Sequence, residues 1–379
     1  MFHWIGQLIE GAGGTALFRF QTSRALFAFI FALGLGLIIG RPIIHWLYRN
    51  GMRSKERKYQ ALDTGSKQGT PVMGGLILAI AGIGSALMWC DLSNSQVWVV
   101  LGTGLWFALI GAIDDYKKVE GNDAEKGLSR PAKLFAQLGL GACLGAYLFV
   151  SSSSPFPESI ISNFYVPFRS EPLLQLNQVY LPFLSSPYWD ISIVYVLGAA
   201  IFMGFMTNAV NFTDGLDGLT TVPCLLGFAV MGVFAYVLGH IGLSEYLLYD
   251  NIPGSGEITV LCSAMMGACL AFLWFNVYPA DVFMGDSGSL MLGGMLGATA
   301  LVLKQEVLML VVGGVFVLEL ATSALQEQSL KRSGKRLFAA APLHHLYQFR
   351  GIAESKIVVR LWIVSVLFAA MALATLKIR

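Results

Sequence analysis

Six aspartates stand at or just beyond the ends of apolar segments, where a charged side chain is costly to keep unless it has a function. Adjacent carboxylates such as Asp114 and Asp115 repel each other, which raises one pKa unless a cation holds both ionised. Mg²⁺ prefers oxygen ligands and typically binds one or two carboxylates together with substrate phosphates. Because lysines neighbour these acids in the sequence, the pattern indicates a Mg²⁺–phosphate site. The six residues are Asp114, Asp115, Asp214, Asp217, Asp281 and Asp286.

Any one of these aspartates is equally well explained as a solvated loop residue that marks the end of a helix. The set as a whole favours a site, because three loops far apart in the sequence present acids at the same depth relative to the apolar segments. No G-x-x-x-x-G-K-[ST] motif occurs, so bound phosphates are not expected in a P-loop.

The segment Asn211-Phe-Thr-Asp214-Gly-Leu-Asp217-Gly218 spaces three polar side chains by three residues. A helix would place them on one face. Gly215 and Gly218 favour a tight bend instead, in which backbone amides can approach a ligand closely.

A second glycine-flanked acid occurs in Phe283-Met-Gly-Asp286-Ser-Gly-Ser289. Ser287 or Ser289 could begin the helix that follows, and the N-terminus of that helix would offer amide donors to an anion.

His344 and His345 follow Pro342 within a long basic segment. A lone histidine is more often packed or solvated than catalytic. For two adjacent histidines that face the acids, a structural role and a catalytic role are equally expected. They could contact phosphate or donate a proton near neutral pH. Adjacent histidines point apart on most backbones, so a zinc pair is not expected.

The elements that position these residues are membrane helices. The 379-residue chain is 55% hydrophobic and only 13% charged, with a mean hydropathy of +0.65, whereas soluble domains contain about 25% charged residues. The five cysteines do not indicate a disulfide-stabilised protein, and a net charge of +2 does not indicate a nucleic-acid-binding protein. The sequence therefore predicts an all-α, polytopic membrane protein that forms a single domain over residues 1–379.

A spanning helix needs about 20 mostly apolar residues, and ten segments of the chain meet this requirement. The eighth and ninth are separated only by residues 304–306, so one interrupted helix or a re-entrant hairpin is an alternative there. The ten segments are roughly 22–48, 71–89, 97–113, 134–152, 190–210, 218–239, 258–277, 288–303, 307–326 and 357–376.

The basic residues predict the orientation, because short loops rich in Lys and Arg stay cytoplasmic. Loops 49–70, 114–133 and 327–356 are rich in basic residues, whereas 90–96 and 240–257 have none. With ten spans, both termini are expected on the periplasmic side and the aspartates on the cytoplasmic face.

Several motifs occur together in an order that resembles one enzyme family. The sequence resembles the phospho-N-acetylmuramoyl-pentapeptide transferases, of the polyprenyl-phosphate N-acetylhexosamine-1-phosphate transferase superfamily, over residues 20–379. The resemblance implies transfer of phospho-MurNAc-pentapeptide from UDP-MurNAc-pentapeptide to undecaprenyl phosphate, giving lipid I and UMP. It also implies Mg²⁺, the inner membrane of a bacterium and a homodimer. The motifs are Lys67-Gln-Gly-Thr70-Pro71-Val-Met-Gly74-Gly75, Asp114-Asp115-Tyr116-Lys117-Lys118, residues 208–219, Phe275-Asn276-Val-Tyr-Pro, Phe283-Met-Gly-Asp286 and residues 374–379.

The same resemblance implies roles for individual residues. Asp286 corresponds to the Mg²⁺ ligand, and Asp114 and Asp115 to paired catalytic acids, with Asp114 the expected base. His344 and His345 match the first two of a histidine triplet, whereas Leu346 stands where the third is usual and Gln348 where Glu is usual. The expected substrate-binding residues, with Phe283 against the uracil ring, are Lys67, Thr70, Lys126, Lys133, Asn211, Asp214, Asp217, Asn276 and Phe283.

The sequence leaves two alternatives. A related transferase for UDP-GlcNAc or another hexosamine stays open because of Leu346 and Gln348. A cation-coupled transporter is disfavoured, because transporters place acids near the middle of spans. Here the acids gather at one face, with Glu319 the main exception. The residue types do not distinguish direct attack by the lipid phosphate from a mechanism with an aspartyl-phosphate intermediate. Direct attack is preferred because it needs one fewer covalent intermediate.

Overall fold

The computed structural model describes residues 18–54, 69–121, 127–149, 163–164, 174–175 and 192–377. Within these ranges the helices are joined by turns and loops, and the strands are two of two residues each, β1 (Asn163–Phe164) and β2 (Leu174–Gln175), which pair antiparallel. The predicted all-α architecture is confirmed. The predicted site residues Lys67 and Lys126 lie outside the described residues.

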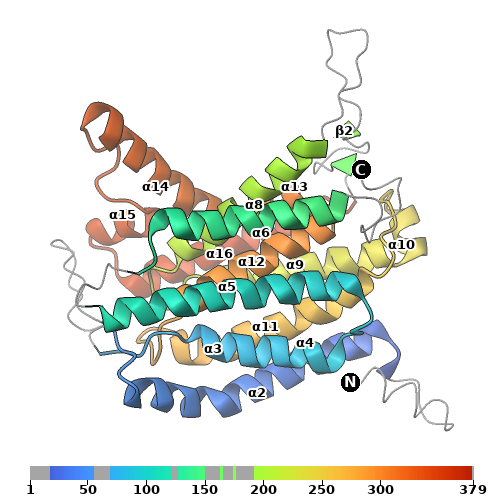
Figure 1. Ribbon diagram of the computed structural model, residues 1–379, viewed down its shortest axis with the longest axis horizontal. Coiled ribbons are helices and arrows are strands. Elements are labelled where there is room, and N and C mark those ends of the chain that lie inside the picture. The colour runs from blue at the N-terminus through green and yellow to red at the C-terminus, as the bar shows by residue number, and fades with distance from the viewer. Residues whose placement is uncertain are drawn as a thin grey trace.

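Helices follow one another along almost the whole described chain (Figure 1). In order they are α2 (Gln21–Arg49), α3 (Gly75–Leu78), η3 (Ala79–Ile83), α4 (Gly84–Trp89), α5 (Ser95–Glu120), α6 (Arg130–Phe149), α8 (Ser192–Thr213), α9 (Thr221–Gly239), α10 (Ile241–Tyr246), α11 (Gly256–Asn276), α12 (Gly285–Val302), α13 (Glu306–Val312), α14 (Gly314–Ser333), α15 (Leu343–Phe349) and α16 (Glu354–Ala374).

Seven described helices are long and apolar enough to cross a membrane: α2, α5, α6, α8, α9, α11 and α16. An eighth crossing results if α13 and α14 count as one span. The chain is therefore a multi-pass membrane protein. The remaining two predicted spans do form helices, but Gly75–Trp89 is short and α12 begins with a polar turn, so length and composition alone support fewer than ten crossings.

The ninth predicted span, 307–326, is broken inside its apolar run. Helix α13 ends at Val312, α14 begins at Gly314, and the two differ in direction by 84°. The sequence suggested an interruption at 304–306, where α12 and α13 do separate, but the sharp bend lies one short helix later. Figure 1 shows α14 leaving the bundle as a result.

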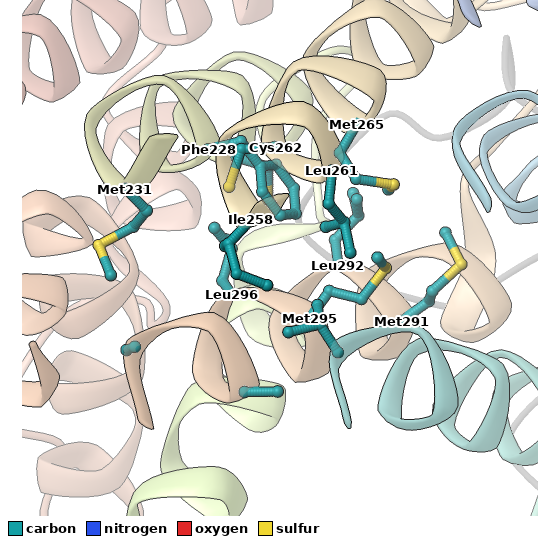
Figure 2. Close-up of a cluster of buried hydrophobic side chains, with 14 of the residues drawn as sticks. Phe228, Met231, Ile258, Leu261, Cys262, Met265, Met291, Leu292, Met295 and Leu296 are labelled. Atoms are coloured by element: carbon teal, nitrogen blue, oxygen red, sulfur yellow. The ribbon is translucent and has the colours of Figure 1, made fainter. Parts of the chain in front are cut away.

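Helix α12 lies at the centre of the bundle and is buried from Ser287 to Val302. It packs against α5, α8 and α9, while α11 packs against α2 and α9. Methionine and leucine side chains fill the space between α9, α11 and α12 (Figure 2). Flexible methionines suit irregular gaps of this kind. In lipid, such close packing replaces the hydrophobic effect as the force that holds helices together.

The outer helices expose large apolar side chains. Ile38 of α2, Leu109 of α5 and Ile363 of α16 are each more than half exposed. Contiguous apolar surface on several helices is expected where a protein contacts lipid. The outer helices thus present the apolar side chains that contact with lipid requires.

Candidate active site

Three aspartates from two helices converge at one end of the bundle. Asp114 and Asp115 lie in the last turns of α5, and Asp286 lies in the first turn of α12. One carboxylate oxygen from each lies within 4.8 Å of the others. Asp114 and Asp115 are buried, whereas Asp286 remains partly accessible. This end of the bundle therefore concentrates negative charge where α5 meets α12.

A glycine on α5 lets the two helices come this close. Gly111 lies one turn before Asp114, and a Cβ atom at this position would overlap the backbone of Asp286 and Ser287. Any side chain there would push α12 away from α5. The approach of Asp286 to Asp114 and Asp115 thus depends on a residue without a side chain.

Asp115 caps α12. Its Oδ1 accepts the backbone N–H of Asp286 at 2.9 Å, and its Oδ2 accepts that of Ser287 at 2.9 Å. These amides are among the unpaired donors of a helix N-terminus, where a negative charge is also favoured by the helix dipole. The anion predicted for this helix start is therefore supplied by the protein itself. Asp115 holds the first turn of α12, and with it Asp286, in place.

Two lysines bridge the other two carboxylates. Lys118 Nζ lies 2.6 Å from Asp114 Oδ2 and 2.9 Å from Asp286 Oδ1. Lys133 Nζ, from α6, lies 2.7 Å from both Asp114 Oδ2 and Asp286 Oδ2. Three carboxylates and two ammonium groups leave one negative charge in excess. Carboxylate oxygens in this number suit a hard divalent cation, and the lysines suit phosphate oxygens.

Lys118 is not among the predicted site residues, although it belongs to the motif Asp114-Asp115-Tyr116-Lys117-Lys118 and to a predicted loop rich in basic residues. Its position four residues after Asp114 was the available signal, because residues at i and i+4 of a helix lie side by side. Since α5 continues to Glu120, Lys118 belongs to the helix rather than to the loop.

The segment 211–218 forms the tight bend that its glycines predicted. Helix α8 ends at Thr213, and Gly218 has a φ of 77°, which the left-handed region allows to glycine without strain. Asn211 is still within the helix and donates from Nδ2 to Ser289 Oγ on α12 at 2.8 Å. The helical alternative holds for Asn211 but is wrong for the residues from Asp214 onward.

A buried asparagine of α11 and a partly buried glutamate of α16 hold the Gly218 half of this turn. Asn276 Oδ1 accepts the backbone N–H of Gly218 at 3.0 Å, and its Nδ2 donates to Val282 O at 2.9 Å. Glu354 Oε1 accepts the N–H of Asp217 at 3.0 Å, while Asp217 Oδ2 accepts that of Ala280 at 3.2 Å. Asp217 and Asn276, both predicted to bind substrate, thus also fix the local backbone.

Thr70 and Phe283 lie on two paired backbone segments. The N–H of Phe283 donates to Pro71 O at 2.9 Å, and the N–H of Gly74 donates to Phe283 O at 2.8 Å. The carbonyl of Thr70 accepts the N–H of Ser54 at 2.9 Å. The Phe283 side chain is partly accessible at the start of α12. This pairing ties the segment before α3 to the segment that leads into Asp286.

The two histidines lie in α15 and have different partners. His344 is buried, and its Nδ1 lies 3.0 Å from Glu319 Oε2 on α14. His345 is half-buried, and its Nδ1 lies 2.8 Å from Gln348 Oε1. Their rings do not point apart as expected, since the centroids are 4.3 Å from each other. Glu319, which the sequence marked only as an acid within a span, is the residue that the histidine prediction missed.

Comparisons with known proteins identify the family. A family model described as glycosyl transferase family 4 matches residues 97–304. The chain is 40% identical to the phospho-N-acetylmuramoyl-pentapeptide-transferase of Maridesulfovibrio salexigens over the full length of both. Proteins of the same name from Pelobacter propionicus and Ruegeria pomeroyi are each 41% identical, covering 96% and 100% of this chain and 95% and 100% of their own length.

The chain belongs to the phospho-N-acetylmuramoyl-pentapeptide-transferase family. The motif-based prediction of this family is confirmed, and neither the other hexosamine transferases nor a transporter is favoured. Family membership makes the protein a membrane transferase. The matched range 97–304 includes Asp114, Asp115 and Asp286, whereas α15 lies outside it. The roles of individual site residues stay predictions.

Proposed function

We propose that the protein transfers phospho-MurNAc-pentapeptide from UDP-MurNAc-pentapeptide to undecaprenyl phosphate, giving lipid I and UMP, the first membrane step of peptidoglycan synthesis. The observation that supports this most strongly is the 40% identity, over the full length of both chains, to a protein of that name. The cluster of carboxylates and lysines adds chemical support, because the reaction joins two phosphate-bearing substrates.

Like-charge repulsion is the first obstacle to this reaction. An oxygen of the lipid phosphate attacks the β-phosphorus of the sugar nucleotide, and the bond from that phosphorus to the bridging oxygen breaks as UMP leaves. Lys118 and Lys133 lie close enough to Asp286 to offset phosphate charge beside it. Positive groups fixed in advance stabilise charge without reorganising during the reaction.

Asp114 is expected to act as a base that removes a proton from the lipid phosphate, and its contribution is expected to be modest. The second pKa of a phosphate monoester is about 6, so the nucleophile is already largely ionised at neutral pH. Direct attack therefore needs little help with proton removal. Asp115 is occupied by the N-terminus of α12 and has a positioning part.

We propose that Asp286 holds Mg²⁺ with help from Asp114. Oxygens of Asp114 and Asp286 lie within 4.8 Å of each other, and carboxylate oxygens are the donors that this ion prefers, while Asp115 holds the first turn of α12 beside them. The bound ion would polarise the diphosphate and neutralise charge on the departing UMP. Lys118 and Lys133 would then be free to contact phosphate oxygens.

The remaining predicted residues are proposed to contact substrates. His344 and His345 are proposed as catalytic-site residues on the α15 side of the turn. The turn and its neighbours are proposed to bind the nucleotide and its sugar. The proposed contacts are Lys67, Thr70, Lys126, Lys133, Asn211, Asp214, Asp217, Asn276 and Phe283.

We further propose ten crossings, with α3–α4 and α12 added to the eight that composition supports. Helix α12 is enclosed by other helices, so a polar first turn does not expose charge to lipid. Near the two ends of the chain, Arg24 pairs with Glu257 and Lys377 donates to Tyr246, all at the far end of α11 from Asn276. Together with the basic loops, which favour a cytoplasmic site, this supports both termini on the periplasmic side of the inner membrane. A homodimer is proposed on the family resemblance alone.

The direct test is UMP release by the purified protein. UDP-MurNAc-pentapeptide with undecaprenyl phosphate and Mg²⁺ should give UMP and lipid I. UDP-GlcNAc in place of the first substrate is the matched control and should give little UMP. Turnover with UDP-GlcNAc alone would move the protein to a different hexosamine transferase.

A further inference from the structure

Glu319 is a buried carboxylate in the middle of the broken span. It lies in α14 with no exposed surface, and a buried charge is costly unless it is paired and hydrogen-bonded. Its Oε2 lies 3.0 Å from His344 Nδ1 and 3.4 Å from the backbone N of the same residue. Among the described residues its Oε1 has no hydrogen-bond partner. The carboxylate is therefore directed at His344.

The interaction fixes which ring nitrogen carries a proton. Glu319 Oε2 also accepts the backbone N–H of His344, so this oxygen is the acceptor and His344 Nδ1 is the donor. His344 Nε2 is then turned away from Glu319, and it has no hydrogen-bond partner among the described residues although it is buried. A carboxylate that orients a histidine through one nitrogen sets the direction of the other.

The free edge of the His344 ring rests on the 211–218 turn. A Cβ atom added to Gly215 would overlap His344 Nε2 and Cε1, so the imidazole contacts the glycine backbone directly. Gly215 lies between Asp214 and Leu216, one residue from the first of the two acids in the turn. The ring takes the space that a side chain at this position would need.

The turn is thus supported at both of its halves by different means. Asn276 and Glu354 hold the Gly218 half through hydrogen bonds to backbone amides. His344 packs against the Gly215 half, and Glu319 holds His344. Asp214 and Asp217 lie between these supports, so their positions depend on both.

We propose that Glu319 is a positioning residue for nucleotide binding: it orients His344, which in turn fixes the Gly215 half of the turn that presents Asp214 and Asp217. This inference rests on the proposed function, because it gives that turn a part in the nucleotide site. Glu319 acts through His344 and has no contact with the reacting atoms.

The test is UMP affinity of the full-length, detergent-solubilised protein, measured by calorimetry alongside KM and kcat for UMP release. Glu319→Ala and His344→Ala should each weaken UMP binding about tenfold, as expected for a lost hydrogen bond to a charged group. The double variant should be no weaker than either single variant. Glu319→Gln should restore most of the affinity, because its amide oxygen can accept from Nδ1.

Two controls separate positioning from a general loss of structure. Glu327→Ala changes the same residue type two turns later on α14, where Glu327 is exposed and pairs with Lys331 at 2.8 Å. It should leave UMP affinity within about twofold of the parent. Gly215→Ala should weaken UMP binding in the parent, yet add nothing in the His344→Ala background, where the methyl group has room.

The inference is overturned if Glu319→Ala lowers the melting temperature but leaves UMP affinity and KM unchanged, since that is a purely structural effect. It is also overturned if the losses in the Glu319→Ala, His344→Ala double variant are additive. A parent that binds UMP but releases none from UDP-MurNAc-pentapeptide would contradict the proposed function instead, and the affinities of the variants would still decide the part of Glu319.

Discussion

The carboxylate cluster and the 211–218 turn lie at the same end of the bundle but are held in different ways. In the cluster, full charges face one another, and Lys118 and Lys133 each bridge Asp114 and Asp286. In the turn, neutral amides, Glu354 and a packed imidazole fix the backbone. Ion pairs can exchange partners when a phosphate arrives, whereas a backbone fixed by hydrogen bonds cannot. The comparison indicates a cluster that reacts and a turn that positions.

The largest expected effect is at Asp286. Asp286→Asn keeps the size of the side chain but removes the charge that both lysines and the proposed metal contact, so turnover should fall at least about 10³-fold. The melting temperature should change little, because Asp115 still caps α12. The measurement is UMP release together with thermal unfolding.

Near-normal turnover of Asp286→Asn would remove this residue from the metal site. Asp114→Asn is the informative partner variant. It should cost less than Asp286→Asn, since the lipid phosphate is already ionised without a base.

The second-largest loss of activity is expected at Lys118 and Lys133. Lys118→Met and Lys133→Met should each lower kcat/KM about 100-fold, because each removes a positive charge beside the reacting phosphates. Lys117→Met is the matched control, since Lys117 is the exposed neighbour of Lys118 on α5. Equal losses in Lys117→Met and Lys118→Met would show that only the general charge of this surface matters.

An intermediate loss of activity is expected for Gly111→Ala, which should push α5 away from α12. The added methyl group overlaps the backbone of Asp286, and overpacking of this kind costs about 1–3 kcal/mol. Both the stability and the turnover should fall. Gly102→Ala on the same helix is the control, because nothing lies within 4 Å of a Cβ at that position; identical results for the two variants would contradict the close-approach argument.

The smallest effect on the chemical step is expected in the turn. Asn276→Ala leaves the N–H of Gly218 and the carbonyl of Val282 without their partner, which should cost about 1–3 kcal/mol of unfolding free energy. KM for the sugar nucleotide should rise more than kcat falls. A lower kcat at unchanged KM would place the turn with the reacting cluster rather than with nucleotide binding.

Much of this arrangement could be predicted from the sequence. Long apolar segments predict the helices, and the acids of the motifs lie where α5 ends and α12 begins. Gly215 and Gly218 predicted the bend: Gly218 adopts a left-handed backbone that few other residues allow, and Gly215 leaves room for the His344 ring. These features are local, so local patterns suffice to find them.

The remainder depends on contacts between distant segments. Nothing local distinguishes Asp115, which caps α12, from Asp114, which pairs with lysines, because the difference arises only where α5 meets α12. Glu319 and His344 are 25 residues apart and meet because the chain turns back between the end of α14 at Ser333 and the start of α15 at Leu343. The separate bend between α13 and α14 had a local signal, the pair Gly313–Gly314 inside an otherwise apolar run.

Manganese binding tests the central claim most directly. Mn²⁺ can replace Mg²⁺ and is visible by electron paramagnetic resonance, so its binding to the purified protein reports the metal site without turnover. We expect the parent and Asp281→Asn, an exposed acid of the neighbouring turn, to bind Mn²⁺ in the presence of the sugar nucleotide, and Asp286→Asn to lose it. Undiminished Mn²⁺ binding by Asp286→Asn would contradict a metal held between α5 and α12.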